Sequence, residues 1–390
     1  MLKNVRSAEK LKRVTILALL ILVAFSPVFS CSGANYENTY ELLDHVGGSV
    51  QCRLTVSVTS SLYDYYKSKS HTISTHTEFA KFVTPDALRP IADDLWSIYQ
   101  DEEDFANGVL MIVHQIPYEE SGPQKYPIET MVENKGDCDL FSFIAASIMK
   151  AGGIDVILLY YEDQTHMNVG VHLSDEPKDV RFDVYYLNYS GKPYYIAETT
   201  GNIQNWENEW RVGECPDEFK GLSPRIITLE NSEQSSPEQV SSSYSDLAAS
   251  SITLELSSKV TIEGSAIMVS GTISPTYSSE NVTIYVSSDG SSWYPLQRVT
   301  VDSNGHYAYY WNVQLIGKVY LRASWAGYEE YAGADSAVHF LLVLPKYLLF
   351  FIITSIVLTI VLIVIKIVER RHAEEAPQDT YSTIEPTEFE

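Results

Sequence analysis

Residues 134–142 read Asn-Lys-Gly-Asp-Cys-Asp-Leu-Phe-Ser and lead into an apolar run that a pair of glycines ends. The turn residues before Cys138 predict a helix that begins at this cysteine, with Asp137 at its N-cap. The positive end of a helix dipole stabilises a thiolate, which is the nucleophilic form of cysteine. The carboxylates of Asp137 and Asp139 oppose this effect because they disfavour another negative charge nearby. The helix end alone is therefore insufficient to activate Cys138, and a cationic partner is needed.

The residues after this helix alternate in the manner of β-strands and supply a histidine. Antiparallel strands are predicted over residues 154–161, 166–173, 181–187 and 194–200. His166 opens the second of these strands, and Glu198 lies near the end of the fourth. A carboxylate in that position could hold the ring of a histidine on a neighbouring strand. Cys138, His166 and Glu198 therefore form a candidate set of nucleophile, base and orienting carboxylate.

Four short motifs occur in an order that resembles the transglutaminase-like domains, a branch of the papain-like thiol fold. They are Tyr126-Pro-Ile-Glu-Thr130, Gly136-Asp-Cys-Asp139, His166-Met-Asn-Val-Gly-Val171 and Tyr194-Tyr-Ile-Ala-Glu-Thr-Thr-Gly201. The resemblance implies an α+β domain with Cys138 as the nucleophile and His166 as the general base and acid. Glu198 would orient the histidine, where many relatives have aspartate. The aromatic residue that follows the histidine in the family is missing, so substrate specificity is not carried over.

The same residues allow two functions from different classes. In the first, the Cys138 thiolate attacks an amide carbonyl and passes the acyl group to water or to an amine, with no metal and no organic cofactor. We favour hydrolysis of an extracellular protein or peptide substrate. The backbone N–H of Cys138 is the expected oxyanion donor, and the side chain of Gln115 is an alternative. In the second, the domain is a catalytically inactive cell-surface module that binds a polymer or a neighbouring protein.

The second half of the chain predicts an all-β domain. Residues 251–344 contain about seven short alternating runs, with an Asp-Gly and an Asn-Gly pair that favour hairpin turns. This pattern is typical of an immunoglobulin-like or fibronectin-like β-sandwich. Residues 229–250 are rich in Ser, Glu and Gln and predict a linker between the sandwich and a first domain at 36–228.

Apolar segments at both ends predict contact with a lipid bilayer. Residues 1–34 combine basic residues with a short apolar run, which indicates a secretory signal peptide or an uncleaved anchor helix. Residues 347–365 carry no charge, and basic residues follow them, so we expect a single transmembrane helix over 347–368. The acidic tail, 369–390, would then be cytoplasmic and both domains extracellular. This domain order resembles that of membrane-anchored prokaryotic surface proteins.

Composition argues against nucleic-acid binding and against a CxxC-type zinc or redox site. The chain has 27 Lys and Arg against 51 Asp and Glu, a formal net charge of −24. Nucleic acid is not an expected partner, because phosphate binding needs clustered basic residues. The cysteines are Cys31, Cys52, Cys138 and Cys215, and their spacing fits no CxxC-type zinc or redox site. A disulfide between Cys52 and Cys215 is an alternative that the sequence leaves open.

Overall fold

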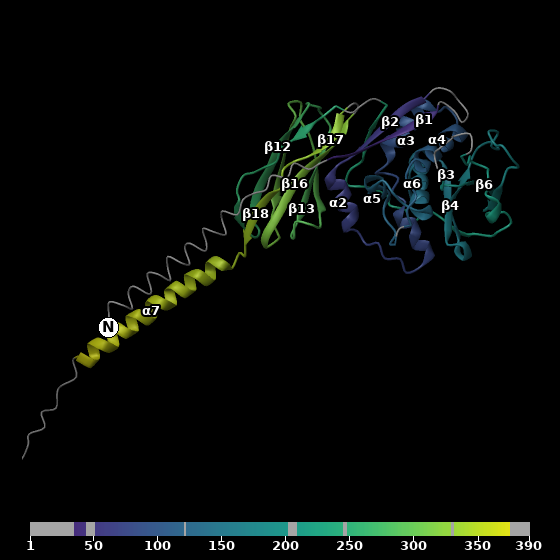
Figure 1. The fold of residues 1–390 in the computed structure, drawn as a ribbon. Coiled ribbons are helices and arrows are strands. Elements are labelled where there is room, and N and C mark those ends of the chain that lie inside the picture. Colours follow the sequence, from purple (N-terminus) through teal and green to yellow (C-terminus); the bar gives the residue numbers. More distant parts are fainter. Residues whose placement is uncertain are drawn as a thin grey trace, which may run out of the picture.

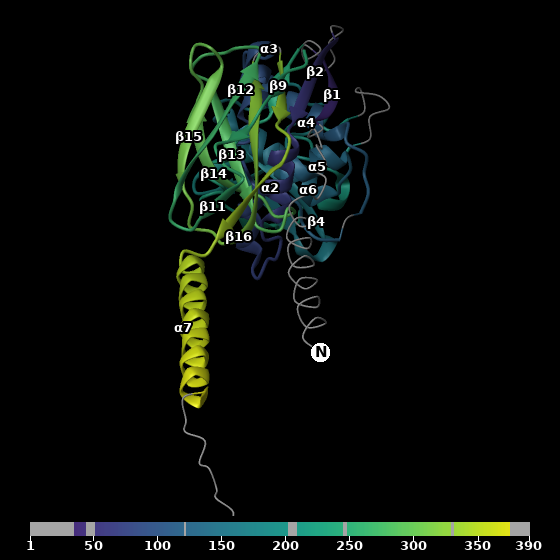
Figure 2. The same cartoon turned by 90° about the vertical axis from the view of Figure 1, so that its left-hand side faces the viewer.

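The computed structural model describes residues 35–43, 51–120, 122–201, 209–244, 248–328 and 331–374. These residues form two adjoining lobes, and helix α7 (Leu348–Glu374) projects from the second lobe (Figure 1). A view turned by 90° shows the same helix leaving from one end of the β-rich lobe (Figure 2). The predicted signal peptide at 1–34 and residues 375–390 of the predicted tail lie outside the described residues.

Most of the described helices of the first lobe pack against one central helix. The α-helices of this lobe are α2 (Ser60–Ser68), α3 (Arg89–Ile98), α4 (Glu102–His114), α5 (Pro127–Glu133) and the central helix α6 (Cys138–Ala151). Helix α6 contacts α3, α4 and α5 on some sides and strands β3 and β4 on another, and α2 packs on α5. Nearly all of its side chains are buried, as expected for a helix that is apolar all round. Asp137 occupies the N-cap position, so Cys138 is the first helical residue, as predicted.

A five-stranded antiparallel sheet carries the other predicted site residues. Its order is β5 (Tyr186–Tyr189), β6 (Lys192–Ala197), β4 (His166–His172), β3 (Asp155–Tyr161) and β7 (Arg225–Ile227). Three of the four predicted strands form close to their expected bounds. The strand predicted over 181–187 begins only at Tyr186, because Arg181 donates its backbone N–H and its guanidinium to Glu214 and not to a neighbouring strand.

The first lobe also contains a sheet that the sequence did not predict. Its order is β1 (Tyr36–Leu43), β2 (Gln51–Val58) and β8 (Ser241–Ser243). Leu42 and Leu54 from this sheet are fully buried in the same hydrophobic core as helix α6. The sheet therefore belongs to the domain that carries the candidate site.

The second lobe consists of two packed sheets. One contains β10 (Glu255–Leu256), β12 (Ala266–Ser274) and β15 (His306–Asn312), with β9 (Ser251–Ile252) paired to β12. The other contains β11 (Val260–Ile262), β18 (His339–Leu344), β16 (Gly317–Tyr328), β13 (Asn281–Ser287) and β14 (Tyr294–Thr300), with β17 (Tyr331–Asp335) paired to β16. Trp325 is fully buried in a core of this lobe that is separate from the core around α6.

The two lobes meet across buried hydrogen bonds. The carboxylate of Glu238 accepts from Thr59 Oγ1 of the first lobe at 3.2 Å. It also accepts from Tyr285 Oη at 3.1 Å and from Ser324 Oγ at 2.8 Å, both in the β-rich lobe. Residues 229–250, which we expected to be a linker, therefore take part in the contact between the lobes, and they contribute strand β8 to the first lobe.

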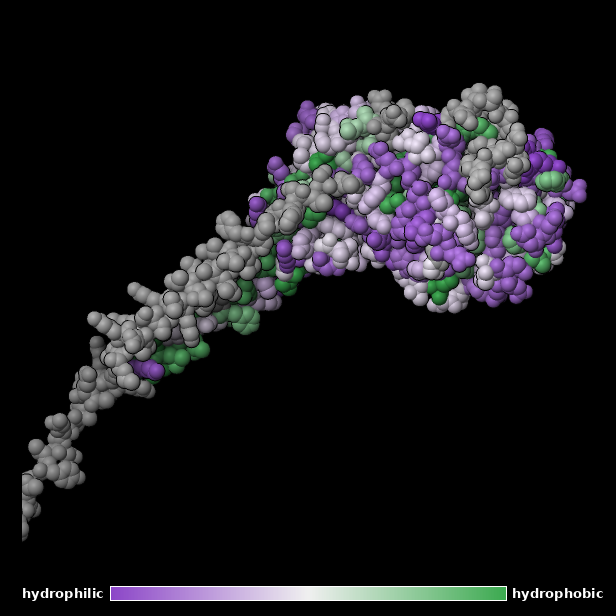
Figure 3. Space-filling model, viewed as in Figure 1, coloured by the Kyte–Doolittle hydropathy of each residue, from purple (hydrophilic) through white to green (hydrophobic). Residues whose placement is uncertain are grey.

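The prediction of a transmembrane helix over 347–368 is wrong. None of the helices in the described part of the chain is both long enough and apolar enough to cross a membrane. Helix α7 begins at Leu348 but runs beyond the uncharged stretch into a sequence that includes Lys366 and Glu369. The fold class is accordingly corrected to mixed α and β structure with several sheets. The visible surface of the first lobe is mostly hydrophilic, whereas green hydrophobic residues show along α7 (Figure 3).

Candidate active site

Cys138 lies where helix α6 meets the turn between β3 and β4. The residue is 8% exposed, and its sulfur lies 3.8 Å from the backbone carbonyl oxygen of Thr165. Thr165 has a φ of 48°, a left-handed conformation that closes the turn after Tyr161. His166 follows at once as the first residue of β4. The tight turn therefore brings the predicted histidine next to the predicted nucleophile.

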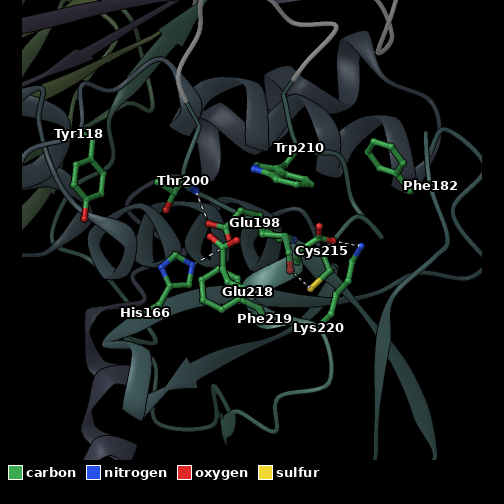
Figure 4. A pocket seen from close by; sticks show the side chains of 12 residues that line it. Tyr118, His166, Phe182, Glu198, Thr200, Trp210, Cys215, Glu218, Phe219 and Lys220 are labelled. Carbon is green, nitrogen blue, oxygen red and sulfur yellow. Dashed lines mark hydrogen bonds and ion pairs between the residues drawn. The ribbon is translucent and has the colours of Figure 1, made fainter.

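Glu198 holds the ring of His166 through its Nε2 atom. Nε2 of His166 lies 2.9 Å from Oε2 of Glu198, which is 1% exposed just after β6 (Figure 4). The other carboxylate oxygen accepts the backbone N–H of Thr200 at 2.9 Å. Asn168 donates a longer hydrogen bond of 3.4 Å to Oε2. The structure thus brings all three predicted site residues together.

The pKa of His166 reflects its position between an acid and a thiol. Burial of the ring lowers this pKa, but hydrogen bonds to Cys138 and Glu198, together with the charges of both groups, outweigh burial and raise it to about 10. At neutral pH the ring is therefore an imidazolium. With Nε2 engaged by Glu198, Nδ1 is the nitrogen left for the thiol. This is the cationic partner that the sequence required for Cys138.

The acidic neighbours of Cys138 repel a thiolate less than the sequence suggested. Burial raises the pKa of the Asp139 carboxyl, and a hydrogen bond with Asp137 and the charge of Asp137 raise it further. The Asp139 carboxyl consequently retains its proton to a higher pH than an isolated aspartate would. Less negative charge then faces the N-terminus of α6.

Two aromatic or imidazole side chains that the sequence did not single out support the pair of His166 and Glu198. Phe219 stacks on the ring of His166, with centroids 4.3 Å apart and an interplanar angle of 11°. Behind Glu198, Nε2 of the fully buried His114 lies 3.0 Å from the backbone carbonyl oxygen of Glu198. Burial lowers the pKa of His114 to about 4, although Oε2 of Glu209 lies 3.4 Å from Nδ1 and favours the charged ring. Nε2 donates its hydrogen bond, because a carbonyl oxygen can only accept.

Gln115 does not occupy the position of an oxyanion donor. Its side-chain amide donates to the backbone carbonyl oxygens of Glu41 and Met111, at 2.9 and 2.8 Å. Its Oε1 accepts the backbone N–H of Glu41 at 2.8 Å. These contacts fasten α4 to β1, so the backbone N–H of Cys138 stays the expected donor.

A cavity of about 750 Å³ opens beside His166 and Glu198. Its wall also includes Tyr118, Phe182, Thr200, Trp210, Cys215 and residues 216–220 (Figure 4). Cys138 and Cys215 are both free thiols, so the disulfide between Cys52 and Cys215 is not formed. Among the described residues, no group of His, Cys, Asp and Glu side chains is arranged to hold a metal ion.

Comparisons with known proteins leave the family open. No family model matches the sequence, and no curated protein matches it. Among solved structures, the chain is similar to the adhesin InvE of Yersinia pseudotuberculosis, with 15% identity and a TM-score of 0.18. The match covers 45% of this chain and 53% of the adhesin chain, so the chain spans about half the length of that structure. A similarity this weak carries no argument about function.

Proposed function

We propose that this protein is a transglutaminase-like cysteine enzyme that hydrolyses peptide or amide bonds. The observation that carries the proposal is the contact of His166 with Glu198 at 2.9 Å, beside Cys138 at the start of a buried helix. A nucleophile, a base and an orienting carboxylate in hydrogen-bond sequence are the signature of nucleophilic catalysis. The adjacent cavity supplies room for a peptide.

The proposed acyl transfer starts from the Cys138 thiolate and the His166 imidazolium. The Cys138 thiolate forms a bond to the amide carbon, and the electron pair of the carbonyl moves to its oxygen. The backbone N–H of Cys138 stabilises this oxyanion. When the carbon–nitrogen bond breaks, the imidazolium of His166 gives its proton to the leaving amine and a thioester remains. His166 then takes a proton from water, and the oxygen of that water attacks the thioester, which releases the acid and restores the Cys138 thiolate and the His166 imidazolium.

The test is the alkylation rate of Cys138 by iodoacetamide, followed by peptide mass in the full chain from pH 5 to 10. Cys215 is an internal control, because burial raises the pKa of its thiol to about 11. We expect Cys138 to react near its maximal rate already at about pH 6, well below the pKa of about 8.5 of a free thiol. His166→Ala should abolish this low-pH reactivity. Equal reactivity of Cys138 in both proteins would contradict the proposal.

One observation favours the second candidate, a binding module without turnover. Cys138 itself is not among the residues that line the cavity, although His166 and Glu198 are. A site of this shape could bind a ligand without using the thiol. Cys138→Ala separates the two functions, because it would abolish hydrolysis by an enzyme but leave binding by a module intact.

A further inference from the structure

Aromatic rings line the cavity beside the site, and two of them are exposed. Tyr118 and Phe182 line it with 51% and 61% of their surface exposed, which is high for large apolar side chains. Trp210 lies on one side of the hollow, while Phe219 and Glu218 lie on the opposite side, next to His166 (Figure 4). Exposed apolar side chains that gather around one cavity mark a binding surface more often than scattered single ones do.

The charges on the cavity wall leave one carboxylate available. Lys220 pairs with Asp217, at 2.7 Å, and His166 pairs with Glu198. Glu218 is exposed, and within the described ranges no ion pair is found for it. The cavity therefore combines aromatic faces with an exposed carboxylate for which no ion pair is found among the described residues.

We propose that this cavity binds a cationic side chain of the substrate, with an ammonium or guanidinium group placed between Trp210 and Glu218. A cation is attracted both to the negative face of an aromatic ring and to a carboxylate. The inference rests on the proposed function, and it names the substrate class as peptides that carry a lysine or arginine close to the amide that is attacked.

The charge of the whole chain favours the same class of substrate. A formal net charge of −24 attracts cationic peptides and repels acidic ones over distances of several ångströms beyond contact. Glu218 adds a local negative charge at the cavity itself. Long-range attraction and local recognition thus point to the same ligand.

Binding can be measured without turnover in the full-length Cys138→Ala protein. Isothermal titration calorimetry compares acetyl-Ala-Lys-Ala-amide with its norleucine and glutamate counterparts. We expect the lysine peptide to bind at least tenfold more tightly than the norleucine peptide, and the difference to shrink as salt is added. A second Glu218→Gln change should abolish most of the preference. Glu176→Gln is the matched control, because Glu176 is exposed but does not line the cavity.

Three outcomes would overturn the inference: equal affinity for the lysine and norleucine peptides, no binding of either peptide, or a lysine preference that survives Glu218→Gln. The alkylation test on Cys138 is independent of all three. An activated thiol without lysine preference would leave the proposed function in place and remove the cation site. A lysine preference with an unreactive thiol would leave the cation site in place and contradict the proposed function.

Discussion

Nε2 of His166 and Oε2 of Glu198 lie 2.9 Å apart, with the carboxylate almost fully buried. A buried carboxylate stabilises the imidazolium more strongly than an exposed one would, because little water screens the pair. The pair fixes the orientation of the ring and leaves Nδ1 for the thiol of Cys138. We therefore expect the reactivity of Cys138 to depend on Glu198, a residue that does not touch it.

Glu198→Gln should weaken the activation of Cys138, because it removes the negative charge beside the ring of His166. The amide keeps the shape but removes the negative charge that helps to raise the pKa of His166 to about 10. We expect alkylation of Cys138 at pH 6 to slow at least about tenfold, and any hydrolysis to fall by about 10² or more. The Glu176→Gln protein should match the unmodified chain in both assays. An unchanged pH profile in Glu198→Gln would show that the carboxylate has no part in activation.

His114 is expected to act as a positioning residue for Glu198. His114→Ala removes the donor to the Glu198 carbonyl oxygen, so the free energy of unfolding should fall by about 1–3 kcal/mol. His114→Gln offers a replacement N–H and should recover part of this loss. The readout specific to positioning is the low-pH alkylation of Cys138, which should weaken in the Ala variant and return in the Gln variant. Equal reactivity in both variants would leave His114 a purely structural residue.

The lowered pKa of His114 also predicts a pH effect. Its folded pKa of about 4 lies below the ordinary value of 6.5, so the unfolded chain takes up the proton first as the pH falls. The stability that the neutral ring contributes is complete above pH 6.5 and is lost as the pH falls toward 4. Thermal unfolding from pH 7 to 4 should show a steeper loss for the unmodified chain than for His114→Gln. Parallel curves would contradict this assignment.

The sequence predicted the site better than its surroundings. Helix α6 and strands β3 and β4 were found because their signals are local: an N-cap before Cys138, and alternation from residue 154 onward. Phe219 and His114 were missed because each reaches the site only through contacts between segments far apart in the chain. No periodic pattern in the sequence reports such contacts.

The sheet of β1, β2 and β8 illustrates the same limit. Strand β8 reads Ser-Ser-Ser, which has no apolar alternation and resembles a linker. It forms a strand because the edge of β2 offers partners to its backbone, as in the pairing of Val56 with Ser242. The apolar stretch after residue 347 shows the opposite error. Its local composition predicted a membrane-spanning helix, but no helix among the described residues is long and apolar enough to cross a membrane.

The contact between the lobes should weaken as the pH rises. Burial, together with the nearby charge of Asp335, raises the pKa of Glu238 to about 8. Burial also raises the pKa of Asp335, although Arg322 opposes this shift. The remaining neighbours, Thr59, Tyr285 and Ser324, donate hydrogen bonds to Glu238. The folded protein therefore holds a proton on Glu238 that the unfolded chain has already released.

Because the folded pKa lies above the ordinary value of 4.5, the stabilisation is complete below pH 4.5 and is lost as the pH rises through about 8. Glu238→Gln mimics the protonated carboxyl at every pH. We expect this variant to match the unmodified chain near pH 5 and to be more stable at pH 9 by about 1–3 kcal/mol, since no charge must then be buried. Thermal unfolding of both proteins from pH 5 to 9, with Glu176→Gln as the control, measures the difference. If Glu238→Gln loses stability with pH as steeply as the unmodified chain, the proton is held elsewhere, and Asp335→Asn becomes the variant that should flatten the curve.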